Sequence, residues 1–90
     1  MNIDKDFFTY KGWRYSFNFR NVYTFEKGDV WKEDGKGAFL EFDENLMKIK
    51  ITSTDKGFNS DGPNCSVKYN GFCRNEDEYN TIIELINLNI

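Results

Sequence analysis

The 90-residue chain contains no histidine and no glutamine, and it has only one alanine and one proline. Without histidine, a nucleophilic site of the Ser-His-Asp or Cys-His type is excluded. Metal sites that depend on imidazole ligands are excluded for the same reason. A catalytic centre would have to consist of carboxylates, lysine, tyrosine or cysteine alone.

Cysteine is also scarce, with residues at positions 65 and 73 only. Two thiols are too few for an all-cysteine zinc site, and their spacing is not that of a CxxC motif. Residues 1–10 lack the apolar segment and the cleavage site of a secretory signal peptide. We therefore expect a cytoplasmic protein in which Cys65 and Cys73 are reduced and structural.

Long apolar runs are missing as well, since none approaches the roughly 20 residues that a membrane-spanning helix requires. We therefore expect no membrane association. The net charge is −3, and all 12 lysine and arginine residues lie within residues 1–75, so the acidic excess falls in the last segment. Because an acidic chain is poorly suited to neutralising phosphates, nucleic acid is a disfavoured partner.

Motifs for cofactors are absent, because no Walker A loop, no GxGxxG and no complete EF-hand loop occurs. The carboxylates of Glu41 and Asp43 would share a strand face, but charged strand positions are usually solvated. We therefore expect no cofactor, no metal and no catalytic residue, and a protein that is not an enzyme.

Asparagine, lysine, isoleucine, phenylalanine and tyrosine are abundant, whereas alanine and proline are rare. This bias is typical of AT-rich coding. It favours an origin in a low-GC bacterium or one of its phages.

Aromatic residues concentrate between residues 7 and 31, and in residues 13–20 they alternate with polar ones. Period two predicts a half-buried strand, with Trp13, Tyr15, Phe17 and Phe19 facing the core and the polar residues facing solvent. In an alternative interpretation the segment is a stacking platform for single-stranded nucleic acid. Such a platform needs aromatic rings on the solvent face beside basic residues.

Turn signals divide the chain up to residue 74 into further short strands. We expect a strand to begin at Val30 and Trp31, a hairpin at Asp34-Gly35, and a second hairpin loop in which Asn45 is left-handed. Residues 53–64 have the composition of a loop. Residues 65–69 form a strand with Cys65, Val67 and Tyr69 on one face.

A helix is predicted over residues 76–88. Asn75 is a suitable N-cap, and three acidic residues in the first turn favour the positive end of the helix dipole. Apolar residues at 79, 82, 83 and 86 form one stripe. The fold class is thus α+β: a single small domain over residues 1–90. It contains an antiparallel β-meander of five or six strands over about 7–74, as an open sheet or a small barrel, with the C-terminal helix packed on it.

The function that these features favour is a small non-catalytic protein-binding module. We expect a phage or mobile-element inhibitor of the counter-defence type, or an adaptor, that acts by steric occlusion of a host or defence protein. Tryptophan, tyrosine and arginine are enriched at binding hot spots. The expected contact residues are Tyr10, Trp13, Arg14, Arg20, Tyr23 and Trp31.

Three other options stay open. An aromatic-rich meander could close into a barrel that holds a small molecule or nucleotide. Less favoured is a single-stranded nucleic-acid binder on an OB-like barrel. A homodimer could form through an exposed sheet edge.

Overall fold

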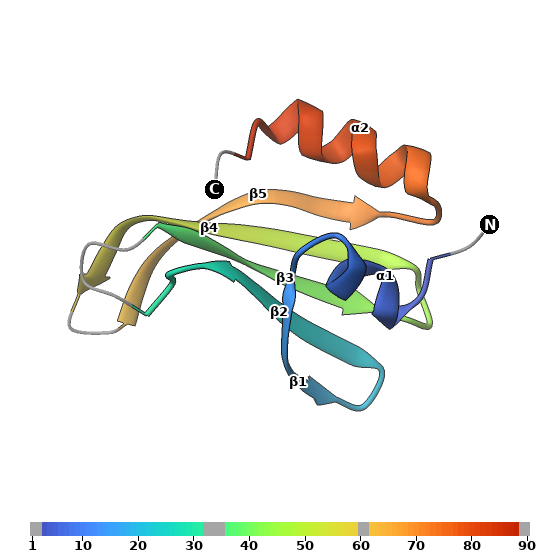
Figure 1. Cartoon of the computed structure of the whole chain (residues 1–90), viewed down its shortest axis with the longest axis horizontal. Coiled ribbons are helices and arrows are strands. Elements are labelled where there is room, and N and C mark those ends of the chain that lie inside the picture. Colours follow the sequence, from blue (N-terminus) through green and yellow to red (C-terminus); the bar gives the residue numbers. More distant parts are fainter. Residues whose placement is uncertain (1–2, 32–35, 60–61, 89–90) are drawn as a thin grey trace.

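The computed structural model describes residues 3–31, 36–59 and 62–88, without the side chains of 55–59 and 62–65. Five strands form one antiparallel sheet in the order β1-β2-β3-β4-β5. The elements are α1 (Lys5–Tyr10), β1 (Arg14–Phe19), β2 (Val22–Gly28), β3 (Gly37–Asp43), β4 (Lys48–Asn59), β5 (Gly62–Phe72) and α2 (Glu76–Ile86) (Figure 1). The predicted α+β meander with a C-terminal helix is confirmed, in its open-sheet form.

The two faces of the sheet differ in what covers them. On one face, here called the helix face, Phe25, Leu40 and Ile51 form one cross-strand row and Phe42 and Ile49 form the next. All five side chains are fully buried beneath the helices. The opposite face is here called the open face.

Helix α1 lies where strand was predicted, so the strands begin at Arg14 and not near residue 7. The carboxylate of Asp4 starts the helix by accepting hydrogen bonds from the backbone N–H groups of Asp6 (3.0 Å) and Phe7 (3.2 Å). Six helical residues are too few to show a periodic apolar pattern. The helix is held by its packing, because Phe8 is completely buried.

Phe8 is the centre of an aromatic cluster that joins both helices to the sheet. Its ring centroid lies 5.5 Å from that of Phe25, 5.0 Å from Phe42 and 5.9 Å from Tyr79. These partners belong to β2, β3 and α2. Both helices are thereby held on the same face of the sheet.

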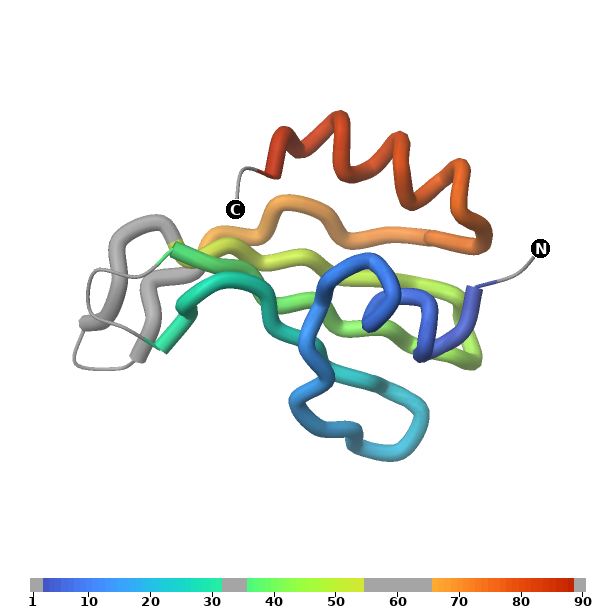
Figure 2. Tube along the Cα trace, viewed as in Figure 1, coloured from blue at the N-terminus to red at the C-terminus, as the bar shows by residue number. Residues whose placement is uncertain are grey.

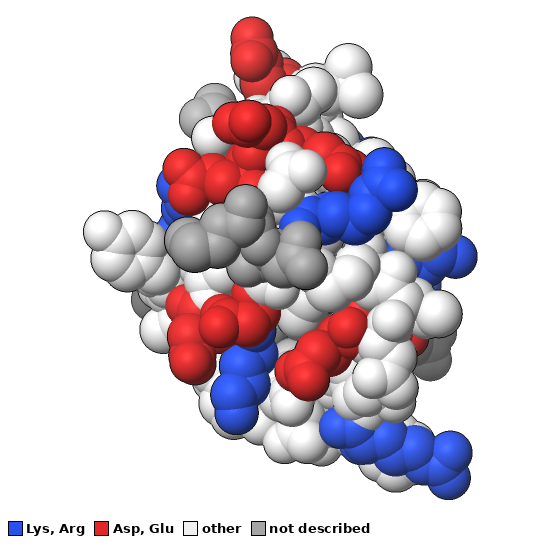
Figure 3. Space-filling model, turned by 90° about the vertical axis from the view of Figure 1, so that its right-hand side faces the viewer, with Lys and Arg blue, Asp and Glu red and all other residues white. Residues whose placement is uncertain are grey.

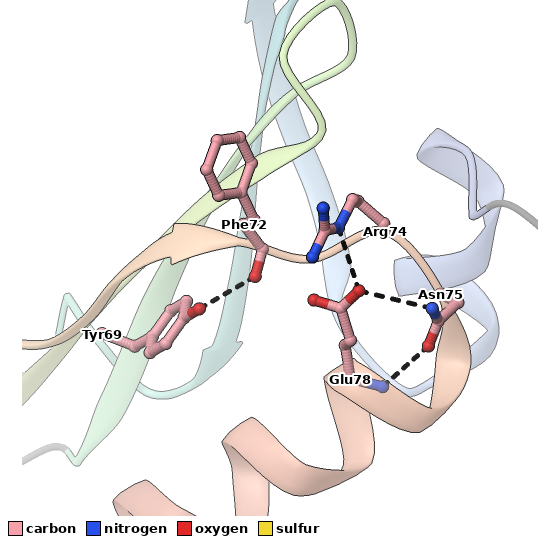
Figure 4. Close-up of polar contacts among 5 residues, drawn as sticks. All are labelled: Tyr69, Phe72, Arg74, Asn75 and Glu78. Atoms are coloured by element: carbon pink, nitrogen blue, oxygen red, sulfur yellow. Dashed lines mark hydrogen bonds and ion pairs between the residues drawn. The ribbon is translucent and has the colours of Figure 1, made fainter.

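Helix α2 begins at the predicted residue and ends earlier than predicted. The side chain of Asn75 accepts a hydrogen bond from the backbone N–H of Glu78 (2.9 Å). The Glu78 carboxylate in turn accepts from Arg74 Nε (3.1 Å) and Asn75 Nδ2 (3.3 Å), which fixes the corner between β5 and α2 (Figure 4). The helix ends at Ile86 because Asn87 adopts a left-handed conformation with φ of 52°.

A β-bulge in β1 overturns the prediction for the aromatic strand. Tyr15 and Phe17 lie opposite consecutive residues of β2, so Ser16 is an extra residue between them. One inserted residue reverses the alternation, and Phe17 and Phe19 therefore point to the open face. Of the four aromatic residues expected in the core, only Trp13 is buried. Tyr15 stays on the helix-face side of the bulge but is 51% exposed at the sheet edge.

A second bulge lies in the other edge strand, β5. Val67 and Tyr69 lie opposite consecutive residues of β4, so Lys68 is the extra residue. Tyr69 packs against the core, whereas Val67 is exposed on the open face. The prediction that Val67 and Tyr69 share a face is therefore wrong. The side chain of Cys65 lies outside the described residues.

Several loop predictions also need correction. Val30 and Trp31 lie in a turn and do not begin a strand. The buried side chain of Val30 packs against Gly37 on the open-face side of the sheet. The left-handed residue of the β3–β4 hairpin is Met47 (φ 53°) and not Asn45. The predicted Asp34-Gly35 hairpin lies outside the described residues.

Residues 53–64 are not a loop. Their described backbone continues β4 and β5, with Phe58 opposite Pro63 and Asn59 opposite Gly62. Pairing across a long hairpin thus overrides the weak strand propensity of this segment. No helix in the described part of the chain is long and apolar enough to cross a membrane.

A buried hydrogen bond from the indole Nε1 of Trp13 to the hydroxyl of Tyr79 (3.0 Å) joins the start of β1 to α2. We predict that Tyr79→Phe lowers the free energy of unfolding by about 1–3 kcal/mol, because the buried indole N–H loses its acceptor. Urea denaturation followed by circular dichroism measures the change.

The control is Tyr10→Phe, which removes the hydroxyl of a side chain that is 88% exposed. This variant should stay within about 0.5 kcal/mol of the wild type. Equal losses in both variants would contradict the role assigned to the Trp13–Tyr79 bond.

Candidate functional site

The open face carries large apolar side chains that no described helix covers. Five of them are between 49% and 67% exposed: Phe17, Phe19, Trp31, Val67 and Phe72. They come from β1, the turn after β2, and β5. Several large exposed apolar side chains on one face of a sheet are typical of an interaction site. The open face is therefore the candidate site.

The hairpin of β1 and β2 presents two of these residues. It extends beyond the rest of the sheet, on the side away from α2 (Figure 2). Phe17 and Phe19 lie on its open-face side, and the guanidinium of Arg20 at the hairpin tip lies 5.3 Å from the Phe19 ring. This end of the face combines exposed rings with a cation, as binding hot spots do.

Trp31 occupies another part of the open face. Its ring packs edge-on against Phe39 with centroids 5.7 Å apart, and its indole N–H donates to the carboxylate of Glu26 (2.5 Å). Arg14 lies opposite Glu26 in the register and donates to the backbone carbonyl of Gly28. The exposed Trp31 ring is thus held in one orientation before any partner arrives.

Phe72 stands at the opposite side of the same face. The ammonium of Lys48 lies 4.9 Å from its ring centroid, and the guanidinium of Arg74 lies 5.4 Å away. The hydroxyl of Tyr69 donates a hydrogen bond to the backbone carbonyl of Phe72 (2.8 Å), three residues further along the chain (Figure 4). The ring is therefore fixed at an ordered end of β5.

Across the strands, the middle of the open face is charged on the side of the β3–β4 hairpin. Asp43 lies opposite Lys48 and Glu41 lies opposite Lys50, so two acidic residues of β3 stand beside two basic residues of β4. These residues line a shallow hollow of about 230 Å³. The face therefore has a polar centre between apolar margins.

The six residues predicted to contact a partner do not form one cluster. Arg14, Arg20 and Trp31 lie on or at the rim of the open face. Tyr23 is half-buried on the helix-face side, and Tyr10 is exposed at the end of α1.

Trp13, also predicted as a contact residue, is 1% exposed and its indole N–H is bonded to Tyr79, so it lies in the core and not on the surface. Sequence reasoning missed Phe17, Phe19, Val67 and Phe72. The first three were missed because the bulges that expose them depend on strand pairing.

A second hollow, of about 720 Å³, lies between α1 and the start of α2. Its carboxylates include Asp4, Asp6, Glu76 and Asp77, and Figure 3, which looks onto this end of the molecule, shows carboxylates gathered there. Helix capping and the helix dipole explain these acidic residues without a ligand.

The groups with clearly shifted pKa values lie on the helix-face side of the sheet and not on the open face. Burial, with a smaller contribution from Glu78, raises the pKa of the Cys73 thiol to about 12. Burial also raises the pKa of Tyr79, although its hydrogen bond with Trp13 acts in the opposite direction. The described residues contain no group of three or more His, Cys, Asp or Glu side chains that could hold a metal ion.

Comparison with known proteins yields no match, whether with protein families, with curated proteins or with solved structures.

We predict that Cys73 is inert in the folded protein. In a Cys65→Ser background, the remaining thiol should not react with a thiol-specific reagent in mildly alkaline native buffer, because it is buried and protonated. In concentrated guanidinium chloride it should react at once. Rapid labelling of the native protein would contradict the buried position.

The same shift predicts how stability depends on pH. The thiol is protonated in the folded state up to a higher pH than in the unfolded state. Its stabilising contribution is therefore complete below pH 9.0 and is lost as the pH rises toward 12. Cys73→Ala should reduce this alkaline loss in urea titrations.

Proposed function

We propose that this protein is a small non-catalytic protein-binding module that acts by covering part of a partner's surface. The observation that carries the proposal is the open face, where five large apolar side chains are exposed on a sheet whose other face is packed. Exposed aromatic residues next to arginine are typical of protein-binding hot spots.

The rigid backing of the face supports this function. Trp31 is held by Phe39 and Glu26, and Phe72 by Lys48 and the β5 corner. Side chains that are already ordered lose little conformational entropy on binding, so more of the contact energy remains as affinity. A module of this size can bind tightly without a catalytic apparatus.

The proposed setting is the cytoplasm of a low-GC bacterium, with the gene carried by a phage or mobile element. Composition supports this origin, because the abundance of asparagine, lysine and isoleucine is typical of AT-rich genes. In such a setting the module would inhibit a host or defence protein, or link two proteins as an adaptor.

The other two functions have less support. A ligand in the mouth of a barrel requires a closed barrel, whereas the strand order leaves β1 and β5 as separate edges. For single-stranded nucleic acid, the exposed Phe17 and Phe19 remove the objection based on strand register. The acidic net charge remains as an argument against it.

We predict that Phe19→Asp weakens binding to the partner by at least about tenfold, since loss of a hot-spot residue typically costs about 2 kcal/mol or more. The measurement is affinity capture from nuclease-treated lysate of a low-GC bacterium, followed by titration of the captured protein. Phe19 is 67% exposed, so the substitution should leave the fold intact by circular dichroism.

The matched control is Leu85→Asp, which places the same charge on an apolar residue of α2 that is 76% exposed. It should capture the partner as the wild type does. Capture that Phe19→Asp leaves unchanged, or retention of oligonucleotides at moderate salt in place of a protein, would refute the proposal.

A further inference from the structure

We propose that a second copy of this chain covers the open face in the free protein, and that the partner must displace it. The inference rests on the proposed function in that both occupants would use the same face. The proposed dimer has two-fold symmetry, and its geometry follows from the strand register.

The charges at the centre of the face are arranged in two columns. On β3, Glu41 and Asp43 point to the open face; on β4, Lys48 and Lys50 do so beside them. A negative column thus lies next to a positive column, in register. Such a pattern can be complementary to itself.

Two face-to-face arrangements with two-fold symmetry are compatible with aligned sheet packing. If the axis runs parallel to the strands between β3 and β4, it places β3 of each copy over β4 of the other. Glu41 then meets Lys50 and Asp43 meets Lys48 of the second copy. If the axis runs across the strands, β3 lies over β3 and acid meets acid. The charge columns therefore select the first arrangement.

The same axis brings the apolar margins together. It places β2 over β5, so Val22 of one copy lies over Phe72 of the other, and Phe19 falls beside that ring. Val22 and Phe72 belong to the same cross-strand row as the Asp43–Lys48 pair. The operation that pairs the charges thus also covers exposed apolar surface.

The size of the face predicts a weak dimer. The axis between β3 and β4 superposes four strands of each copy, β2 to β5. At a spacing of about 4.8 Å and a length of about seven residues, these strands give a shared face of roughly 19 by 24 Å. Two such faces bury on the order of 900 Å², which is below the range of stable specific interfaces and fits a weak, transient one. Burying the charged centre costs desolvation energy, so the dimer should be weak and sensitive to salt. A partner that binds more tightly can displace it.

The test uses two substitutions with opposite effects on charge, Glu41→Lys and Lys50→Glu. Both positions are solvent-accessible, whereas the Asp43 carboxylate accepts hydrogen bonds from Asn21, Asn45 and Leu46 and is left intact. In either variant alone, the proposed dimer would bring like charges together at two symmetric contacts. We expect each variant to dimerise at least about tenfold more weakly than the wild type.

An equimolar mixture of the two variants should restore dimerisation to within about threefold of the wild type, since every contact between chains again joins opposite charges. Sedimentation velocity over a concentration series measures all four samples, with Leu85→Asp as a control that dimerises normally. Each variant also places like charges side by side within its own chain. Mixing cannot repair that, so restoration reports contacts between chains.

Three outcomes would overturn the proposal: a wild type that stays monomeric at all concentrations, single variants that dimerise normally, or a mixture that stays monomeric. None of these requires the partner. A failed dimer together with capture that Phe19→Asp abolishes would leave the proposed function standing. A dimer that behaves as expected, together with capture that Phe19→Asp leaves unchanged, would support the dimer and refute the proposed function.

Discussion

The structure depends on the packing of one side chain, Phe8. Its ring contacts two strands and α2 at once, so it holds both helices against the same face of the sheet. Two helices of six and eleven residues cannot cover both faces of a five-stranded sheet. Concentrating them on one face completes a core there, and it leaves the other face bare. The open face is thus a consequence of how the core is built.

What the open face displays is decided by the two edge strands. Each contains one bulge, at Ser16 in β1 and at Lys68 in β5. An edge strand tolerates an extra residue because only one neighbour must keep its hydrogen bonds. The bulges turn Phe17, Phe19 and Val67 away from the core and toward solvent. They also interrupt regular pairing along the edges, which protects a sheet from indiscriminate edge-to-edge association.

The two tryptophans show how position determines role for the same side chain. Trp13 precedes β1 and is buried, and its indole N–H finds an acceptor in Tyr79. Trp31 lies in a turn, and its indole N–H is bonded to Glu26 while most of the ring stays exposed. A buried indole N–H needs an acceptor within the protein, whereas an exposed one can also donate to water. Only the second leaves its ring available, so aromatic residue type alone is a poor guide to a binding site.

Patterns within short stretches of the sequence predict the elements that are stabilised by contacts between neighbouring residues. The Asn75 cap and the apolar stripe with Tyr79 and Ile82 predict α2, and the alternation of isoleucine and lysine predicts which side of β4 is buried. Helix α1 and the open face could not be found in this way. Phe8 makes α1 stable through contacts with distant strands. A bulge is a relation between two strands, which periodicity within one strand does not contain. Tertiary pairing therefore decided which aromatic residues form the core and which are exposed to solvent.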